Sequence, residues 1–340
     1  MKLLTILISS IMLSSFVSAQ TVDLHSHNVL PEFVEFLEQH GAAMEEGFPL
    51  PRWDAESHLR FMDEAGIDKS VLSMPAPQPY QAGAEECRRV VREYNEASAA
   101  LKAAHPDRFL FCASLPLPDV EAAIEEAVYA LDTLGADGIK LATNSCGQYL
   151  GDPALDSLMS VLDARGAVVI LHPHKPVPVN ESLTAAVPLA AYEYPAETTR
   201  AVLNMLVRDV PARYPHIRFV IPHCGSFLPL ALPRLQAIQR ALATNGGRPE
   251  TDWEANMRNL YYDLAGNPSP EVVRTLLTIT SPDHLLYGSD YPYLPSEVLA
   301  GNLKRLRQQL SDDETLAPHA EGILGTNALK LFTDNKNDKQ

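Results

Sequence analysis

Eight short segments rich in Val, Ile and Leu recur along the chain, with longer helical stretches between them. These segments span residues 21–27, 69–74, 108–114, 137–143, 167–173, 217–223, 259–265 and 284–290. Strands that alternate with helices are typical of parallel β-α-β units. Nearly continuous apolar strands are expected where both faces of a sheet are buried. The chain is therefore predicted to be an α/β protein that folds as a (β/α)8 TIM barrel, with its active site at the carboxyl ends of the strands.

Two long segments between the predicted strands and helices have no clear periodicity of their own. Residues 28–54 follow the first strand and residues 173–195 follow the fifth. Loops of this length in a compact domain are usually functional. Both are expected to border the active site, whereas the polar residues 333–340 are expected to form a disordered tail.

The amino-terminal residues read as a targeting signal rather than as part of the barrel. Lys2 precedes an apolar run from Leu3 to Val17, and small residues lead up to Ala19 and Gln20. This arrangement predicts a secretory signal peptide over residues 1–19, since the run is too short for a comfortable membrane span. We expect an exported protein, periplasmic or secreted, with residues 20–335 as a single barrel domain and no membrane contact after cleavage. An uncleaved anchor is the less favoured alternative.

The charge balance restricts the kinds of partner. The chain has 27 Lys and Arg against 43 Asp and Glu, a formal net charge of −16. Nucleic acids require basic patches, so this balance argues against them as partners. The sequence leaves open whether the protein forms a homodimer.

The four cysteines are scattered and show no metal-binding or redox spacing.

Five side chains that can bind metals fall at the ends of predicted strands: His25, His27, His172, His223 and Asp290. Each alone could be an ordinary turn or cap residue, but in a barrel all five would meet at one rim. His25 and His27 are two residues apart and would point to the same side of their strand. Imidazole and carboxylate ligands suit one divalent ion, zinc first and manganese as the alternative. Three His and one Asp with an open position indicate a catalytic site rather than a structural one.

Four motifs carry these residues: "DLHSH", "LHPHKP", "VIPHCGSFLP" and "LLYGSDYPYLP". With them the sequence resembles the amidohydrolase superfamily over residues 21–310, in the amidohydrolase-related branch of metal-dependent decarboxylases and hydrolases. That branch includes aminocarboxymuconate-semialdehyde, γ-resorcylate and 6-methylsalicylate decarboxylases. The resemblance implies that His25, His27, His172 and Asp290 hold one metal ion. It also implies that His223 serves as an acid or base beside the ion.

Three further polar residues lie close to these motifs. Lys140 is near the end of the fourth strand, where binuclear members of the superfamily carry a carboxylated lysine between two metals. The surrounding motifs resemble the mononuclear branch, so we expect one ion. Asp23 would either orient a ligand or be a satisfied interior carboxylate. His174 is expected to be a pocket residue at most.

The candidate substrate-binding residues come from the predicted rim loops. Arg52 could bind a carboxylate in bidentate fashion or brace the first long loop. Asn144 is a polar candidate. Aromatic residues near the rim would suit a flat, ring-shaped substrate, among them Trp53, Tyr194, Phe227 and Tyr293.

The resemblance implies a lyase that removes CO₂ without oxidation from an aromatic or dienoic carboxylic acid, of the 6-methylsalicylate or hydroxybenzoate type. Asp290 would deliver a proton to the carbon that bears the carboxyl group, and His223 would assist. The alternative is a hydrolase that opens a lactone, ester or amide with the same five residues. A non-catalytic binding protein would be expected to have lost one of the five, and all five are present.

Overall fold

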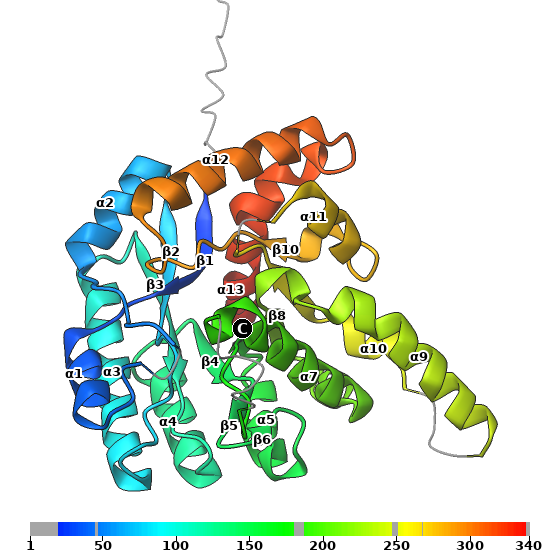
Figure 1. Cartoon of the computed structure of the whole chain (residues 1–340), viewed down its shortest axis with the longest axis horizontal. Coiled ribbons are helices and arrows are strands. Elements are labelled where there is room, and N and C mark those ends of the chain that lie inside the picture. The colour runs from blue at the N-terminus through cyan, green and yellow to red at the C-terminus, as the bar shows by residue number, and fades with distance from the viewer. Residues whose placement is uncertain (1–19, 45–46, 180–186, 247–250, 267, 338–340) are drawn as a thin grey trace, which may run out of the picture.

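The computed structural model describes residues 20–44, 47–179, 187–246, 251–266 and 268–337 (Figure 1). The predicted signal peptide lies outside the described residues. Within them, no helix combines the length and the apolar character needed to cross a bilayer.

Eight strands form one sheet in the order β1-β2-β3-β4-β7-β8-β9-β10. Their bounds are β1 (Val22–His27), β2 (Lys69–Ser73), β3 (Phe109–Ser114), β4 (Gly138–Ala142), β7 (Val168–His172), β8 (Arg218–Ile221), β9 (Leu260–Asp263) and β10 (Leu285–Leu286). Backbone hydrogen bonds join β1 to the segment that follows β10 and so close the sheet. The Leu24 N–H donates to the Tyr287 carbonyl at 2.9 Å, and the His27 N–H donates to the Tyr291 carbonyl at 2.8 Å. The (β/α)8 barrel predicted from the alternation of segments is confirmed.

Helices surround the strands (Figure 1). They are α1 (Pro31–Gln39), α2 (Ala55–Ala65), α3 (Ala84–Ala104), α4 (Val120–Asp132), α5 (Asp156–Asp163), α7 (Glu193–Val207), α8 (Val210–Arg213), α9 (Leu228–Thr244), α10 (Trp253–Met257), α11 (Pro270–Leu276), α12 (Ser296–Asp312) and α13 (Asn327–Asn337). A short hairpin of β5 (Asn144–Ser145) and β6 (Gln148–Tyr149) follows β4. Short 3₁₀ turns lie at Pro153–Leu155, Leu189–Ala191, His223–Gly225, Pro282–His284 and Ala317–His319, and a π turn lies at Gly322–Thr326.

The apolar core has two main parts. One lies between the strands and the surrounding helices and includes Phe61, Phe109 and Tyr262. The other fills the barrel interior, where Val22 and Val168, the first residues of β1 and β7, share a cluster with Ala328, Leu331 and Phe332 of α13. Helix α13 therefore closes the amino ends of the strands. It runs to Asn337, so the prediction of a disordered tail from residue 333 is wrong for residues 333–337.

The two predicted long loops contain more regular structure than their composition suggests. Helix α1 lies inside residues 28–54, with Pro31 in its first turn and Phe33, Phe36 and Leu37 buried. Proline fits the first turn of a helix, and apolar residues three and four apart form one face. In the second loop, α7 begins at Glu193, and residues 180–186 lie outside the described part of the chain.

Candidate metal centre and substrate pocket

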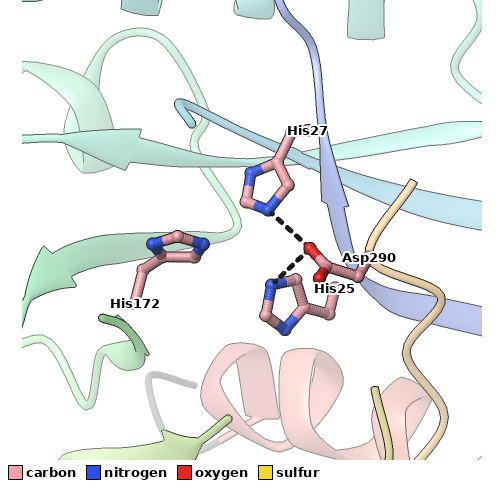
Figure 2. Close-up of side chains that lie close together, drawn as sticks. All are labelled: His25, His27, His172 and Asp290. Atoms are coloured by element: carbon pink, nitrogen blue, oxygen red, sulfur yellow. Dashed lines mark ion pairs between the residues drawn. The ribbon is translucent and has the colours of Figure 1, made fainter. Parts of the chain in front are cut away.

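Four of the predicted metal-site residues come together at one rim of the barrel. His25 and His27 are in β1, His172 is the last residue of β7, and Asp290 follows β10. Their potential ligand atoms all lie within 4.8 Å of one another. Figure 2 shows His25 and His27 turned toward the Asp290 carboxylate, with His172 facing them from the other side. The carboxyl ends of the strands bring these residues together, as the strand pattern predicts.

A bulge in β1 shapes this end of the strand. The pairing of β1 with β2 shifts between Asp23 and Ser26, which interrupts the strict alternation of side chains. Leu24 therefore packs in the barrel interior, while the next residue, His25, already belongs to the metal site. A Cβ atom on Gly288 would lie 2.7 Å from the Cβ of His25, which explains the glycine before Ser289 and Asp290.

Each of the three imidazoles has its Nδ1 atom within hydrogen-bond distance of an oxygen. His25 Nδ1 is 2.8 Å from Asp263 Oδ2, and His172 Nδ1 is 2.8 Å from the Pro173 carbonyl. His27 Nδ1 is 3.2 Å from Ser73 Oγ, which itself donates to the Ser26 carbonyl. These contacts place the proton on Nδ1 and leave the Nε2 lone pair for a metal.

The geometry of the four residues fits a divalent ion. The Nε2 atoms of His25 and His27 are buried and have no hydrogen-bond partner among the described residues. They lie 3.5 Å and 3.3 Å from Asp290 Oδ1. Two atoms bound to one tetrahedral zinc ion are separated by about 3.4 Å, given metal-ligand distances of about 2.0–2.2 Å. An ion at this point would satisfy both imidazoles and the carboxylate.

The electrostatic surroundings favour a cation. Burial lowers the pKa of His27 to about 4 and that of His172 well below its ordinary value, so both are neutral at pH 7. Burial also disfavours the charged form of His25, but Asp263 and then Asp290 outweigh it and raise this pKa to about 9. Although burial would raise the pKa of Asp290, the neighbouring His223, His27 and His25 side chains hold it well below its usual range. Two carboxylates thus stabilise positive charge at the centre of the site.

Asp263 is a buried residue of the site that the sequence analysis missed. It ends β9, and its Oδ2 atom accepts from His25. Its Oδ1 atom accepts backbone N–H groups from His223 at 2.9 Å and Ala265 at 3.1 Å. The available signal was its position near the carboxyl end of the strand predicted over residues 259–265.

Asp23, by contrast, accepts hydrogen bonds from Ser289 and from the His25 backbone N–H, so it is a hydrogen-bonded interior carboxylate that orients the backbone.

The Asp263→Asn variant is expected to bind metal about 10- to 100-fold more weakly, the usual cost of losing the carboxylate behind a ligating histidine. The NH₂ group of the asparagine would also face a donor, either the His25 ring N–H or the backbone N–H groups of His223 and Ala265. Metal titration monitored by calorimetry measures the effect. The control is Asp252→Asn, at an exposed helix cap where asparagine serves equally well. Equal affinity in Asp263→Asn and the wild type would contradict this role.

His223 lies beside the four clustered residues but outside them. Its side chain is 20% exposed, and its Nε2 atom is 3.7 Å from Asp290 Oδ2. His223 and Asp290 have φ angles of 54° and 62°, in the left-handed region, which non-glycine residues adopt at an energetic cost and often at functional sites. Hydrogen bonds from their backbone N–H groups to Asp263 and the His25 carbonyl hold these conformations.

A pocket of about 860 Å³ opens onto the metal site. His172, His223 and Asp290 lie at one end of it. Its other described walls are largely apolar, formed by Phe48, Pro188, Ala190, Ala191, Tyr194, Pro195, Cys224, Ala265, Gly266, Pro268, Ser269, Val272, Tyr293 and Leu294. Tyr293 also packs its ring 5.5 Å from that of His27. Of the six candidate substrate-binding residues, Tyr194 and Tyr293 line this pocket.

The other four lie elsewhere in the structure. Arg52 is exposed and Phe227 is a partly exposed neighbour of Tyr192. Trp53 is buried, and its indole N–H donates to His58 at 3.1 Å. Asn144 is buried and donates to the Lys175 carbonyl at 3.0 Å. None of these four belongs to the described lining of the pocket, so the structure does not place them with the metal site.

Two neighbouring residues have different surroundings. Lys140 is buried in β4, close enough to the site for its charge to help lower the pKa of His27 and His172. His174 is buried, with its Nε2 atom 3.2 Å from the Tyr80 hydroxyl, and is absent from the described pocket lining. The four cysteines are free, and Cys224 is buried.

Comparisons with known proteins extend over almost the whole chain. The family model described as Amidohydrolase matches residues 22–333. The decarboxylase yanB of Aspergillus niger is 35% identical over 92% of this chain and 87% of its own. The 6-methylsalicylic acid decarboxylase of Penicillium expansum is 29% identical over 92% of this chain and 95% of its own. A crystal structure of amidohydrolase II has a TM-score of 0.84 and 32% identity, covering 92% of this chain and 100% of that one.

These matches agree with the geometry. The metal-site residues occupy the strand ends that the motifs predict, and the curated relatives are carboxy-lyases. The resemblance predicted from the motifs is confirmed: the chain belongs to the amidohydrolase family.

Proposed function

We propose that this protein is a metal-dependent, non-oxidative decarboxylase of an aromatic carboxylic acid, of the 6-methylsalicylate or hydroxybenzoate type. The observation that carries this proposal is the pocket, because its largely apolar walls lead directly to the His and Asp cluster. Such walls suit a flat ring, and the cluster suits the carboxylate of the substrate. The relatives named above support the same class of reaction. A dienoic acid is the less favoured substrate.

His25, His27, His172 and Asp290 would hold the ion. A divalent cation bound there would polarise the oxygens of the substrate and stabilise the charge that develops on them. Asp290 has one oxygen toward His25 and His27 and the other toward His223. This carboxylate can therefore hold the ion and also exchange a proton with His223, which lines the pocket.

The reaction needs one proton at the carbon that bears the carboxyl group. Asp290, assisted by His223, would deliver it to that carbon, which interrupts the conjugation of the ring. The bond between this carbon and the carboxyl group then breaks, its electron pair restores the ring, and CO₂ leaves. The apolar walls exclude water and so strengthen the electrostatic effects in the site.

The ion we propose is a single zinc ion, since zinc accepts both imidazole nitrogen and carboxylate oxygen ligands. Manganese is the alternative. Elemental analysis of the purified protein distinguishes the two and gives the number of ions per chain.

The function is tested by incubating the metal-loaded protein with a panel of hydroxybenzoates and measuring CO₂ release. We expect CO₂ from at least one ortho-hydroxybenzoate and none from the His27→Ala variant. A parallel panel of lactones, esters and amides tests the hydrolase alternative. Acid release from that panel, without CO₂ from the first, would contradict the proposal.

We further propose that the protein is exported and that its mature chain begins at Gln20. The charged start, the apolar run and the small residues before Gln20 support this. Amino-terminal sequencing of the native protein, after separation of the cell compartments, is expected to find Gln20 outside the cytosol. Recovery of intact Met1 in the cytosol would contradict it.

A further inference from the structure

The described lining of the pocket contains few polar side chains apart from His172, His223 and Asp290 next to the metal site. Among its described lining residues, those with hydroxyl groups are Tyr194, Ser269 and Tyr293. Ser269 caps α11, where its side chain accepts from the Val272 N–H. No Lys or Arg occurs in the described lining. Recognition of a polar substituent within these walls therefore depends on a small number of uncharged groups.

Tyr194 differs from the other groups in its hydrogen bonding. It is the second residue of α7 and is 7% exposed, with Ala76 and Leu189 as apolar neighbours. Its hydroxyl is buried and has no hydrogen-bond partner among the described residues. Buried hydroxyl groups usually have a partner, because leaving one unpaired costs its desolvation energy.

The position of Tyr194 suggests where such a partner comes from. Its ring centroid lies 6.3 Å from that of His172, one of the four residues of the metal site. A carboxylic acid that reaches the metal site brings oxygens to the same end of the pocket. A phenol can donate a hydrogen bond to such an oxygen.

We propose that Tyr194 is a substrate-binding residue whose hydroxyl donates a hydrogen bond to an oxygen of the bound acid, either of its carboxylate or of a neighbouring ring hydroxyl. The inference rests on the proposed function and adds a determinant of specificity to it. An acid without an oxygen at that place leaves the phenol unpaired and binds more weakly, since sites built to pair a polar group discriminate strongly against analogues that lack it.

The test compares the metal-loaded wild type with the Tyr194→Phe and Tyr192→Phe variants. Tyr192 is a matched control, since it is two residues away, 59% exposed and outside the described pocket lining. Calorimetry measures Kd for 2-hydroxybenzoate and for benzoate, thermal unfolding measures Tm, and CO₂ release from the best hydroxybenzoate substrate measures kcat and KM.

Tyr194→Phe is expected to bind 2-hydroxybenzoate about 10- to 100-fold more weakly, because it loses a hydrogen bond to a negatively charged oxygen or to the ring hydroxyl beside it. KM should rise, and Tm should not fall, because the removed hydroxyl is unpaired in the protein alone. Tyr192→Phe should match the wild type. A penalty confined to 2-hydroxybenzoate assigns the bond to the ring hydroxyl, and an equal penalty for benzoate assigns it to the carboxylate.

Unchanged affinity in Tyr194→Phe overturns the inference, and so does a loss that comes with a lower Tm, which would indicate a structural role. The proposed function is judged separately by the wild type. If the wild type binds hydroxybenzoate without releasing CO₂, while Tyr194→Phe weakens binding, the decarboxylase proposal fails and the Tyr194 inference stands. If the wild type binds neither acid, both fail.

Discussion

The Asp290→Ala variant is expected to lose its bound metal and all measurable decarboxylase activity. Asp290 Oδ1 lies 3.3 Å from His27 Nε2 and 3.5 Å from His25 Nε2, so it supplies the one carboxylate among the four clustered residues. Its removal leaves three imidazoles without the negative charge that balances the cation. The same change removes the group that we propose passes a proton to the substrate. Elemental analysis and CO₂ release measure the two losses.

Three comparisons make this result specific. Asp107→Ala, at an exposed aspartate before β3, should retain metal and activity. His172→Ala should behave as Asp290→Ala does, since it removes another of the four clustered residues. Lys140→Ala should keep about one ion per chain if the site is mononuclear. Two ions in the wild type, falling to one in Lys140→Ala, would contradict a single-ion site, and full metal retention in Asp290→Ala would remove Asp290 from the ligand set.

The His223→Asn variant is expected to keep its metal and its fold and to lose turnover by about 10²- to 10⁴-fold, the usual contribution of general acid-base catalysis. His223 lines the pocket and lies 3.7 Å from Asp290 Oδ2, outside the four clustered residues. Asparagine is the suitable replacement because it tolerates the left-handed backbone at this position, where φ is 54°. It also preserves the backbone N–H that donates to Asp263.

His216→Asn is the matched control for this experiment. His216 precedes β8, as His223 follows it, but its side chain is 71% exposed and pairs with Asp163. This control should turn over as the wild type does. Loss of metal from folded His223→Asn would make His223 a ligand, and normal turnover in that variant would leave Asp290 to act alone.

The pattern of the chain was sufficient to predict the barrel and the members of the metal site. Each strand has a local signal in its apolar, β-branched residues, and parallel strands in a closed sheet must bring their carboxyl ends to one rim. His25, His27 and His172 are therefore near one another in any barrel built from these segments. The same reasoning places Asp290 beside them, although β10 itself covers only Leu285–Leu286.

The tertiary structure alone decided the partners of these residues. Asp263 pairs with His25, which is 238 positions away in the sequence, and no local pattern specifies a contact at that separation. Likewise Trp53 donates to the buried His58 while Arg52 beside it is exposed, because a loop side chain has no periodicity that determines the direction in which it points. Periodic segments are predictable since repeated apolar positions must face a core. The supporting carboxylate and the pocket walls depend on which strands and loops become neighbours, and that is decided only when the barrel closes.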